Sequence, residues 1–232
     1  MHLKEVVIQQ HTFPSREAYP FSLPLFQKTD RLDLSSTVTI FAGENGTGKT
    51  TLLKALCQKC KIHIWEGRHR RRYEVNPFEN RLPESLQIEW VNGPVPGSFF
   101  SPELFRNYSQ LVDEWAVTNP GILNHYGGNS LMTKSHGQST MAYFRSMYQV
   151  RGLHFLDEPE AALSPRTQLE LLHLLTEMAQ AGHAQFIIST HSPILMSCEQ
   201  AAIFSFDGEV IRQVPYRETM HYQIYHRFFT GG

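Results

Sequence analysis

The chain has 232 residues and 41% of them are hydrophobic, so it can bury a sizeable core, which argues against wholesale disorder. Its formal net charge is −1 at neutral pH, and its pI is near 6.9. Global charge therefore gives no argument for nucleic acid or for an anionic membrane as a partner.

Cysteine and histidine usage limits the function classes further. Cys57, Cys60 and Cys198 are too few for a disulfide framework, and the C-x2-C pair lacks a second pair at zinc-site spacing. The 12 histidines show no ligand spacing, so no cluster of these residues is predicted to hold a metal. The chain shows no signal-peptide pattern and no apolar run near the roughly 20 residues that span a bilayer. We therefore expect a soluble, cytoplasmic protein with free thiols.

The first half of the chain opens with mixed segments. Residues 1–36 include a strand candidate at Val6–Ile8, and then a Pro- and aromatic-containing stretch that predicts turns and edge strands. The β-branched and apolar run Thr37–Ala42 predicts a buried parallel strand. A glycine-rich loop follows, and leucines recur with helical period from Thr50 onward. Residues 61–98 alternate like half-exposed strands with turns between them.

The second half adds helices and two more buried strands. Residues 99–149 predict irregular and helical segments, one of them capped by Ser101. The strand "GLHFLDEP" ends in acid, and the following helix opens at Ser164 and stops at Gly182. "QFIIST" predicts a third buried strand, and "AIFSFDGEVIR" predicts a hairpin with Asp207-Gly208 at its turn. The tail "TMHYQIYHRFF" predicts a short amphipathic helix. Its apolar face is expected to dock on the core through Ile224, Tyr225 and Phe228.

A phosphate-binding loop is the strongest single motif. "GENGTGKT" matches G-x-x-x-x-G-K-[ST] between a predicted strand and a predicted helix. Its glycines let backbone N–H groups point at phosphates, and the helix adds its positive N-terminal end. Lys49 would reach the β- and γ-phosphates, and the Thr50 hydroxyl would ligate Mg²⁺. The expected nucleotide contacts come from Gly43, Glu44, Asn45, Gly46, Thr47, Gly48, Lys49, Thr50 and Thr51.

Two further strand ends carry groups suited to phosphate chemistry. Asp157 ends an apolar strand, where it can hold Mg²⁺ beside the loop, usually through water. Glu158 follows it and would point to the other side of the backbone, toward a water near the γ-phosphate. His191 follows "QFIIST", at the sheet edge where open α/β sheets bind ligands. We expect His191 to contact the γ-phosphate or to hold Glu158, so Lys49, Glu158 and His191 are the catalytic candidates.

A Ser-x-Gly-Gln element lies in "SHGQST", far downstream of the phosphate loop. A serine hydroxyl and free N–H groups at a helix start can bind an anion, although an ordinary polar turn would look the same. The order phosphate loop, "SHGQS", "LHFLDEP", "STHSP" resembles the ABC-type ATPase family. The resemblance covers most of the chain through four separate motifs.

The resemblance implies an activity, a fold and a partner. The activity is Mg²⁺-dependent ATP hydrolysis by a cytoplasmic enzyme. The fold is α/β, with a RecA-like core of mostly parallel sheet, an antiparallel β element and a small helical lobe. One domain would fill 1–232, with the core lobe at about 1–98 and 150–232 and the helical lobe at about 99–149. The partner is a second copy, since in this family the signature element meets ATP held by the other subunit. Ser135, Gly137 and Gln138 carry that signature here.

Several positions depart from the family pattern. His136 replaces the first signature glycine, and Ser101 or Glu103 stands where transporter ATPases carry a glutamine. The adenine-stacking aromatic could be Tyr19 or Phe21. The text "DEPEAALSP" with "THSP" resembles soluble ATPases related to the SMC, RecF and AAA-like groups rather than transporter subunits.

Three roles remain open for such an ATPase. The favoured one is a soluble switch acting on nucleic acid or on an effector protein, in nucleic-acid maintenance or defence. The basic run "GRHRRRYE" could touch phosphates, although charge runs are usually just solvated. The alternative is the ATP-binding subunit of a membrane transporter. A phosphotransferase is a third reading, but it explains neither the signature element nor His191.

Overall fold

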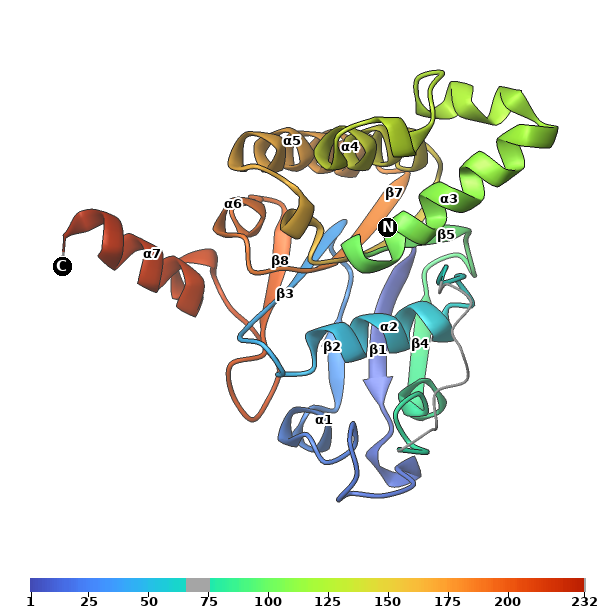
Figure 1. Cartoon of the computed structure of the whole chain (residues 1–232). Helices are drawn as coiled ribbons and strands as arrows, with labels where there is room; N and C mark the ends of the chain where they lie inside the picture. Colours follow the sequence, from blue (N-terminus) through green and yellow to red (C-terminus); the bar gives the residue numbers. More distant parts are fainter. Residues whose placement is uncertain (66–75, 232) are drawn as a thin grey trace.

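The computed structural model describes residues 1–65 and 76–231. It has the predicted α/β class: a six-stranded, mostly parallel sheet and a separate three-stranded antiparallel sheet, with helices on both sides of the larger sheet (Figure 1). The basic run at 67–74 lies outside the described residues.

The larger sheet is built around fully buried parallel strands. Its order is β5-β6-β7-β3-β8-β9, and only the last pairing is antiparallel. Every residue of β3, β6 and β7 is buried, as expected for strands covered on both faces. The strands are β3 (Val38–Ala42), β5 (Gly97–Phe100), β6 (Gly152–Asp157), β7 (Ala184–Ser189), β8 (Ala201–Ser205) and β9 (Arg212–Gln213).

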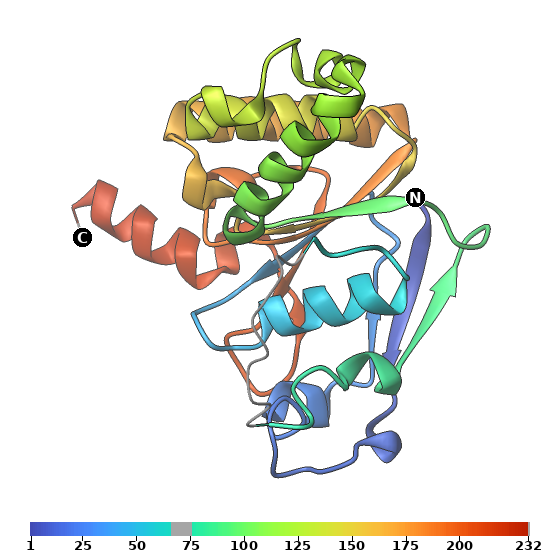
Figure 2. The same cartoon turned by 45° about the vertical axis from the view of Figure 1, so that its right-hand side comes forward.

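Helices and turns complete two layers around this sheet. The helices are α1 (Pro24–Lys28), α2 (Lys49–Lys59), α3 (Pro102–Thr118), α4 (His136–Met147), α5 (Pro165–Ala181), α6 (Pro193–Met196) and α7 (Met220–Thr230). The 3₁₀ turns are η1 (Gln10–Thr12), η2 (Leu82–Ser85), η3 (Pro120–Tyr126), η4 (Leu131–Thr133), η5 (Pro159–Ala162) and η6 (Tyr216–Glu218). Helices α4 and α5 run side by side over one face of the sheet, and α2 lies on the other (Figures 1 and 2).

Successive residues of the central strands point alternately into two separate hydrophobic cores. Ile40 and Leu156 face the core closed by α3, α4, α5 and α6, whereas their neighbours Phe41 and Phe155 face the core under α2. This alternation follows from the two-residue period of a strand. The second core also takes in the antiparallel sheet and α1.

A buried glutamine joins the antiparallel sheet to the parallel one. The small sheet has the order β2-β1-β4, with β1 at Leu3–Ile8, β2 at Arg31–Asp33 and β4 at Leu86–Trp90. Gln185 of β7 is fully buried. Its Oε1 accepts from the N–H groups of His2 and Leu3, both at 2.7 Å, and its Nε2 donates to the carbonyls of Leu3 (2.9 Å) and Leu34 (2.7 Å). Nε2 also donates to the Ser36 carbonyl at 3.1 Å, so one amide pairs five backbone groups in and beside the neighbouring sheet.

All three cysteines are free thiols in the interior. Cys57 and Cys60 lie at the end of α2 in the core beneath the antiparallel sheet, and Cys198 is also buried. Burial raises the pKa of the Cys60 thiol to about 12, and the pKa of the Cys57 thiol is raised still further.

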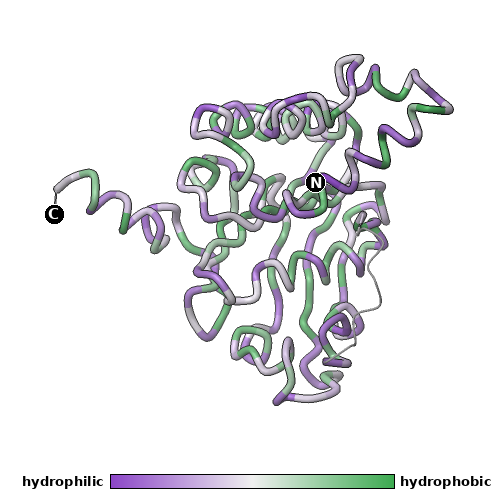
Figure 3. Tube along the Cα trace, viewed as in Figure 1, coloured by the Kyte–Doolittle hydropathy of each residue, from purple (hydrophilic) through white to green (hydrophobic). Residues whose placement is uncertain are grey.

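The local expectations were wrong in three places. The stretch after β1 forms turns and the helix α1 rather than edge strands, because Pro24 takes the first helical position. Residues 61–65 form no strand. Helix α7 forms, but its apolar residues are exposed, with Ile224 56% and Phe228 76% accessible. Other elements already cover the sheet, and α7 extends away from them with alternating hydropathy (Figure 3).

The Gln185 contacts generate a stability prediction. Gln185→Met keeps the volume but removes all five hydrogen bonds, and buried unpaired backbone groups are costly. We expect the free energy of unfolding to fall by about 3 kcal/mol, measured by urea denaturation. Gln87→Met on the exposed face of β4 is the matched control and should change it by less than about 0.5 kcal/mol. Equal losses of unfolding free energy in the two variants would contradict the stabilising role of the Gln185 hydrogen bonds.

Candidate functional site

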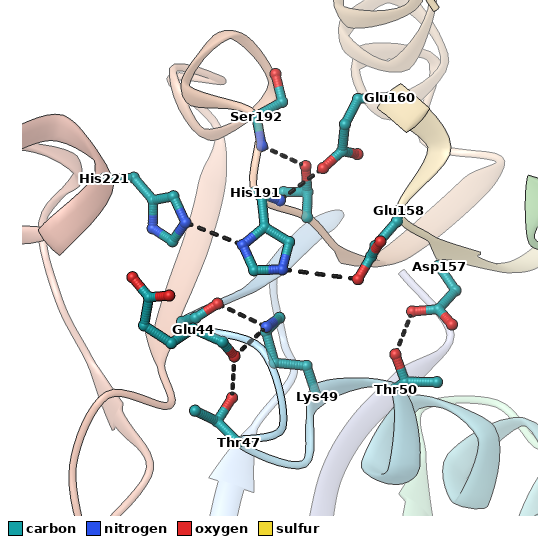
Figure 4. Close-up of polar contacts among 12 residues, drawn as sticks. Glu44, Thr47, Lys49, Thr50, Asp157, Glu158, Glu160, His191, Ser192 and His221 are labelled. Carbon is teal, nitrogen blue, oxygen red and sulfur yellow. Dashed lines mark hydrogen bonds and ion pairs between the residues drawn. The ribbon is translucent and has the colours of Figure 1, made fainter. Parts of the chain in front are cut away.

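The glycine-rich loop between β3 and α2 closes around a buried lysine. Gly48 has φ of 99°, a conformation that strains any other residue, and a Cβ there would also lie 2.9 Å from Leu23 Cδ1, which would have to shift. Lys49 is buried, and its Nζ donates to the carbonyls of Gly43 (2.6 Å) and Glu44 (2.8 Å) (Figure 4). The ammonium thus lies inside the loop, where a phosphate oxygen can be reached.

The electrostatics around this lysine are strongly acidic. Burial lowers the pKa of Lys49, and nearby carboxylates oppose that effect, Glu158 first and then Asp207, Asp157 and Glu44. Asp207 also accepts from the Glu44 N–H at 2.8 Å, which fixes the start of the loop. At the exposed tip, the Thr47 hydroxyl donates to the Glu44 carbonyl at 2.9 Å. Asn45 and Gly46 are exposed there, open to a ligand.

A hydroxyl and a carboxylate meet beside the loop. The Thr50 hydroxyl donates to Asp157 Oδ1 at 2.8 Å, and Asp157 is buried, which raises the pKa of its carboxyl. The Thr50 oxygen at the start of α2 and the Asp157 oxygens at the end of β6 are hard donors, a set that fits Mg²⁺ bound together with phosphates and water. No group of three or more His, Cys, Asp or Glu side chains within 1–65 and 76–231 forms a metal cage. That absence is compatible with Mg²⁺, which is seldom held in an all-protein cage.

Glu158 and His191 come together across two strand ends. Glu158 has φ of 46°, an uncommon conformation for a non-glycine residue, and its N–H donates to the Ser189 carbonyl at 2.8 Å. The chain therefore turns sharply as β6 ends, and the carboxylate comes within 3.6 Å of His191, from Oε1 to Nε2. Lys49, Glu158 and His191 form one constellation (Figure 4).

Sequence reasoning missed two residues that hold His191. The Glu160 carboxylate accepts the His191 N–H at 2.6 Å, and His221 of α7 places its Nε2 3.1 Å from His191 Nδ1 (Figure 4). Burial raises the pKa of Glu160 and lowers those of His191 and His221. An acid two residues after Glu158 was a visible signal, whereas nothing local pointed to His221.

The signature residues lie apart from this constellation. Ser135 caps α4: its hydroxyl accepts from the Gln138 N–H at 3.4 Å, and the Gln138 side chain accepts from the Ser135 N–H at 3.2 Å. Ser135, Gly137 and Gln138 line an open groove of about 560 Å³ that is shared with the start of α5, and no phosphate-loop residue lines it. His136 is exposed, with its ring 6.4 Å from that of Phe105.

The remaining candidates divide between exposed and buried positions. Phe21 is fully buried in the core, so the expectation that it could stack on a base was wrong. Tyr19 is 41% exposed, and its hydroxyl contacts that of Thr51 at the start of α2. At the end of β5, Ser101 is committed to capping α3, and Glu103 is exposed.

The fold and this geometry define a P-loop nucleoside triphosphatase. Residues 132–197 match the protein family described as "AAA domain, putative AbiEii toxin, Type IV TA system", and residues 23–60 match one described as "AAA domain". The hemin import ATP-binding protein HmuV of Rhodopseudomonas palustris is 29% identical over 72% of this chain and 69% of its own length. The manganese transport system ATP-binding protein MntA of Synechocystis is 26% identical over 67% of this chain and 64% of its own.

A solved structure of an inward-facing metal-chelate type ABC transporter shares the fold. It has a TM-score of 0.54 at 17% identity and covers 94% of this chain and 85% of that one. The chain spans about two thirds of the length of the two curated relatives. Together with the four motifs, the sequence matches show that the chain is similar to ABC-type ATPases, and the solved structure shows the same fold. Among the described residues, no helix is both long and apolar enough to cross a bilayer.

The Glu160 contact generates a prediction. Glu160→Ala leaves the His191 N–H without its acceptor, so we expect ATP turnover to fall about tenfold, from a displacement worth about 1.4 kcal/mol. Glu160→Gln keeps an acceptor oxygen in place and should recover most of the activity. Steady-state ATPase assays at saturating ATP measure both. Equal loss in the two variants would show that the negative charge, not the hydrogen bond, is what matters.

Proposed function

We propose that this constellation binds ATP with Mg²⁺ and hydrolyses the bond between its β- and γ-phosphates. The observation that carries the proposal is the meeting of Lys49, the Thr50–Asp157 pair and the Glu158–His191 pair at one sheet edge. When bound, Mg²⁺ supplies positive charge at the β- and γ-phosphate oxygens, and Thr50 and Asp157 are the residues that would hold it.

The side chains divide the remaining work. Lys49 binds the phosphates and offsets their charge. The Glu158 carboxylate accepts a proton from, or orients, the attacking water, and its partly exposed position leaves room for that water. His191 Nε2 faces Glu158 Oε1, so its single N–H can hold the carboxylate or donate to a γ-phosphate oxygen. Tyr19 remains our candidate for contact with the base.

We further propose that two copies pair head to tail, with ATP between them. The segment 99–149, as the helical lobe, would present Ser135, Gly137 and Gln138 to nucleotide held by the partner copy. Two observations support this: these residues line an open groove, and that groove is not lined by the chain's own phosphate loop. The N-terminus of α4 offers N–H groups and a serine hydroxyl to an anion.

Glu158→Gln tests both proposals together. It removes the proton acceptor but keeps the shape, so we expect turnover to fall at least about 100-fold while ATP still binds. The variant should then accumulate as an ATP-dependent dimer, measured by light scattering. Glu199→Gln, an exposed glutamate elsewhere, is the matched control and should behave as wild type.

A second substitution locates the dimer contact. A Cβ at Gly137 would meet only the Ala162 carbonyl, at 3.7 Å, so Gly137→Asp fits sterically and adds charge against an incoming phosphate. Combined with Glu158→Gln, it should return the protein to monomer. A Glu158→Gln variant that stays monomeric at saturating ATP would end the head-to-tail proposal.

For the downstream role we favour a soluble switch that acts on nucleic acid or an effector protein. The "DEPE" text, the lack of a glutamine at the end of β5 and the match of residues 132–197 to a toxin–antitoxin family description support it. The second candidate is the ATP-binding subunit of a membrane transporter. It is supported by relatives such as HmuV and MntA, which carry transport in their names.

DNA binding across a salt series separates these roles. If the switch acts on DNA, affinity with ATP should fall steeply between about 50 and 200 mM salt, by about 10³-fold for six phosphate contacts. Fluorescence anisotropy with a labelled duplex measures the DNA affinity. The control is Lys49→Ala, which is expected not to bind ATP and so should show no ATP-dependent DNA binding. A flat response together with copurification of a membrane-spanning subunit would establish the transporter role instead.

A further inference from the structure

The second histidine of the site comes from a helix outside the motifs. His191 follows β7, and His221 lies in the first turn of α7; their Nδ1 and Nε2 atoms are 3.1 Å apart (Figure 4). The remaining nitrogens, His191 Nε2 and His221 Nδ1, are buried and have no hydrogen-bond partner in the described part of the chain. The pair is therefore a closed two-ring unit with one end toward Glu158.

Proton counting limits this unit to two arrangements. Burial lowers the pKa of both rings, so each is neutral at pH 7 and carries one N–H. One N–H fills the contact between the rings, and the other is left at one outer end. The outer end at His191 lies 3.6 Å from the Glu158 carboxylate, an acceptor, so the N–H is more stable there than a lone pair would be.

The other charges around the rings do not all favour this arrangement. Lys49 opposes an N–H on His191, and Asp207 and Glu44 favour one on His221, so the direct approach of Glu158 to His191 Nε2 is what supports it. Lys49, Glu158 and Glu44 face His191, and Asp207, Glu44 and Lys49 face His221. A γ-phosphate beside Lys49 would bring further acceptor oxygens toward His191 Nε2. A lone pair at that nitrogen would oppose both the carboxylate and the phosphate.

Helix α7 is held to the rest of the chain at its first turn. Thr219 caps it, and the Tyr222 ring packs 4.9 Å from that of Tyr216. Every α7 residue except His221 and Tyr222 is exposed. The position of His221 is thus defined by the helix start, and its ring is directed at His191 rather than at solvent.

We propose that His221 is a positioning residue that donates its Nε2–H to His191 Nδ1 and thereby fixes His191 with its Nε2–H toward Glu158 and the γ-phosphate. This role in catalysis rests on the proposed ATP hydrolysis, whereas the proton arrangement itself does not. The carboxyl end of β7 alone does not set the tautomer of His191. The contact with His221 couples the two tautomers, and the Glu158 carboxylate then favours the N–H at His191 Nε2.

The test combines a spectrum with kinetics. Long-range ¹H–¹⁵N spectra of ¹⁵N-histidine-labelled protein without nucleotide should show His191 protonated at Nε2 in wild type and a tautomer mixture in His221→Ala. In ATPase assays, His221→Ala should lower kcat about tenfold with KM changed less than twofold. His221→Gln, whose side-chain amide reaches the position of Nε2, should recover most of kcat. His226→Ala, from the exposed part of α7, is the matched control and should match wild type.

The outcomes separate the two proposals. A wild-type His191 protonated at Nδ1, or a His221→Ala variant with wild-type tautomer and kcat, would overturn the role of His221. Wild-type protein that binds ATP and Mg²⁺ but does not hydrolyse ATP would instead overturn the proposed function, and the spectra would still test the histidine pair. If His221→Ala fails to fold, the wild-type spectrum and His221→Gln still decide.

Discussion

The parallel pairing of β3, β6 and β7 is the constraint on which the rest of the structure depends. Phe41 and Asp157 both pair with Ser189, so the three strands end at the same level of the sheet. The phosphate loop, the acidic pair and His191 all follow these ends directly. Since parallel strands need long crossovers, residues more than a hundred positions apart meet within one hydrogen-bonded edge.

Charge at this edge is balanced by burial and by carboxylates. Burial lowers the pKa of Lys49, and the carboxylates of Glu158, Asp207, Asp157 and Glu44 oppose that effect. The same acids leave the site short of positive charge for a triphosphate. The proposed function supplies the missing positive charge in two ways. One is a bound divalent cation, and the other is the N–H groups at the start of α4 in a second copy.

The sequence allowed the fold class, the phosphate loop and the strand-end residues to be predicted, because each depends on local pattern and on the rule that parallel strands share an edge. Glu160 was missed because its contact depends on the turn that the left-handed Glu158 imposes. His221 was missed because helical periodicity gives the face of α7 but not where the helix lies. The same limit explains the wrong expectation that Phe228 is docked on the core.

The buried thiols of Cys57 and Cys60 are expected to react slowly with thiol reagents. Thiols with pKa values this high hold almost no thiolate at neutral pH, and maleimides and disulfides react with thiolate. Modification there requires the layer between α2 and the antiparallel sheet to open. The rate at which Cys57 and Cys60 are alkylated therefore reports how often that layer opens. A cysteine introduced at the surface would react much faster, so it can carry a dye while the natural cysteines stay in place.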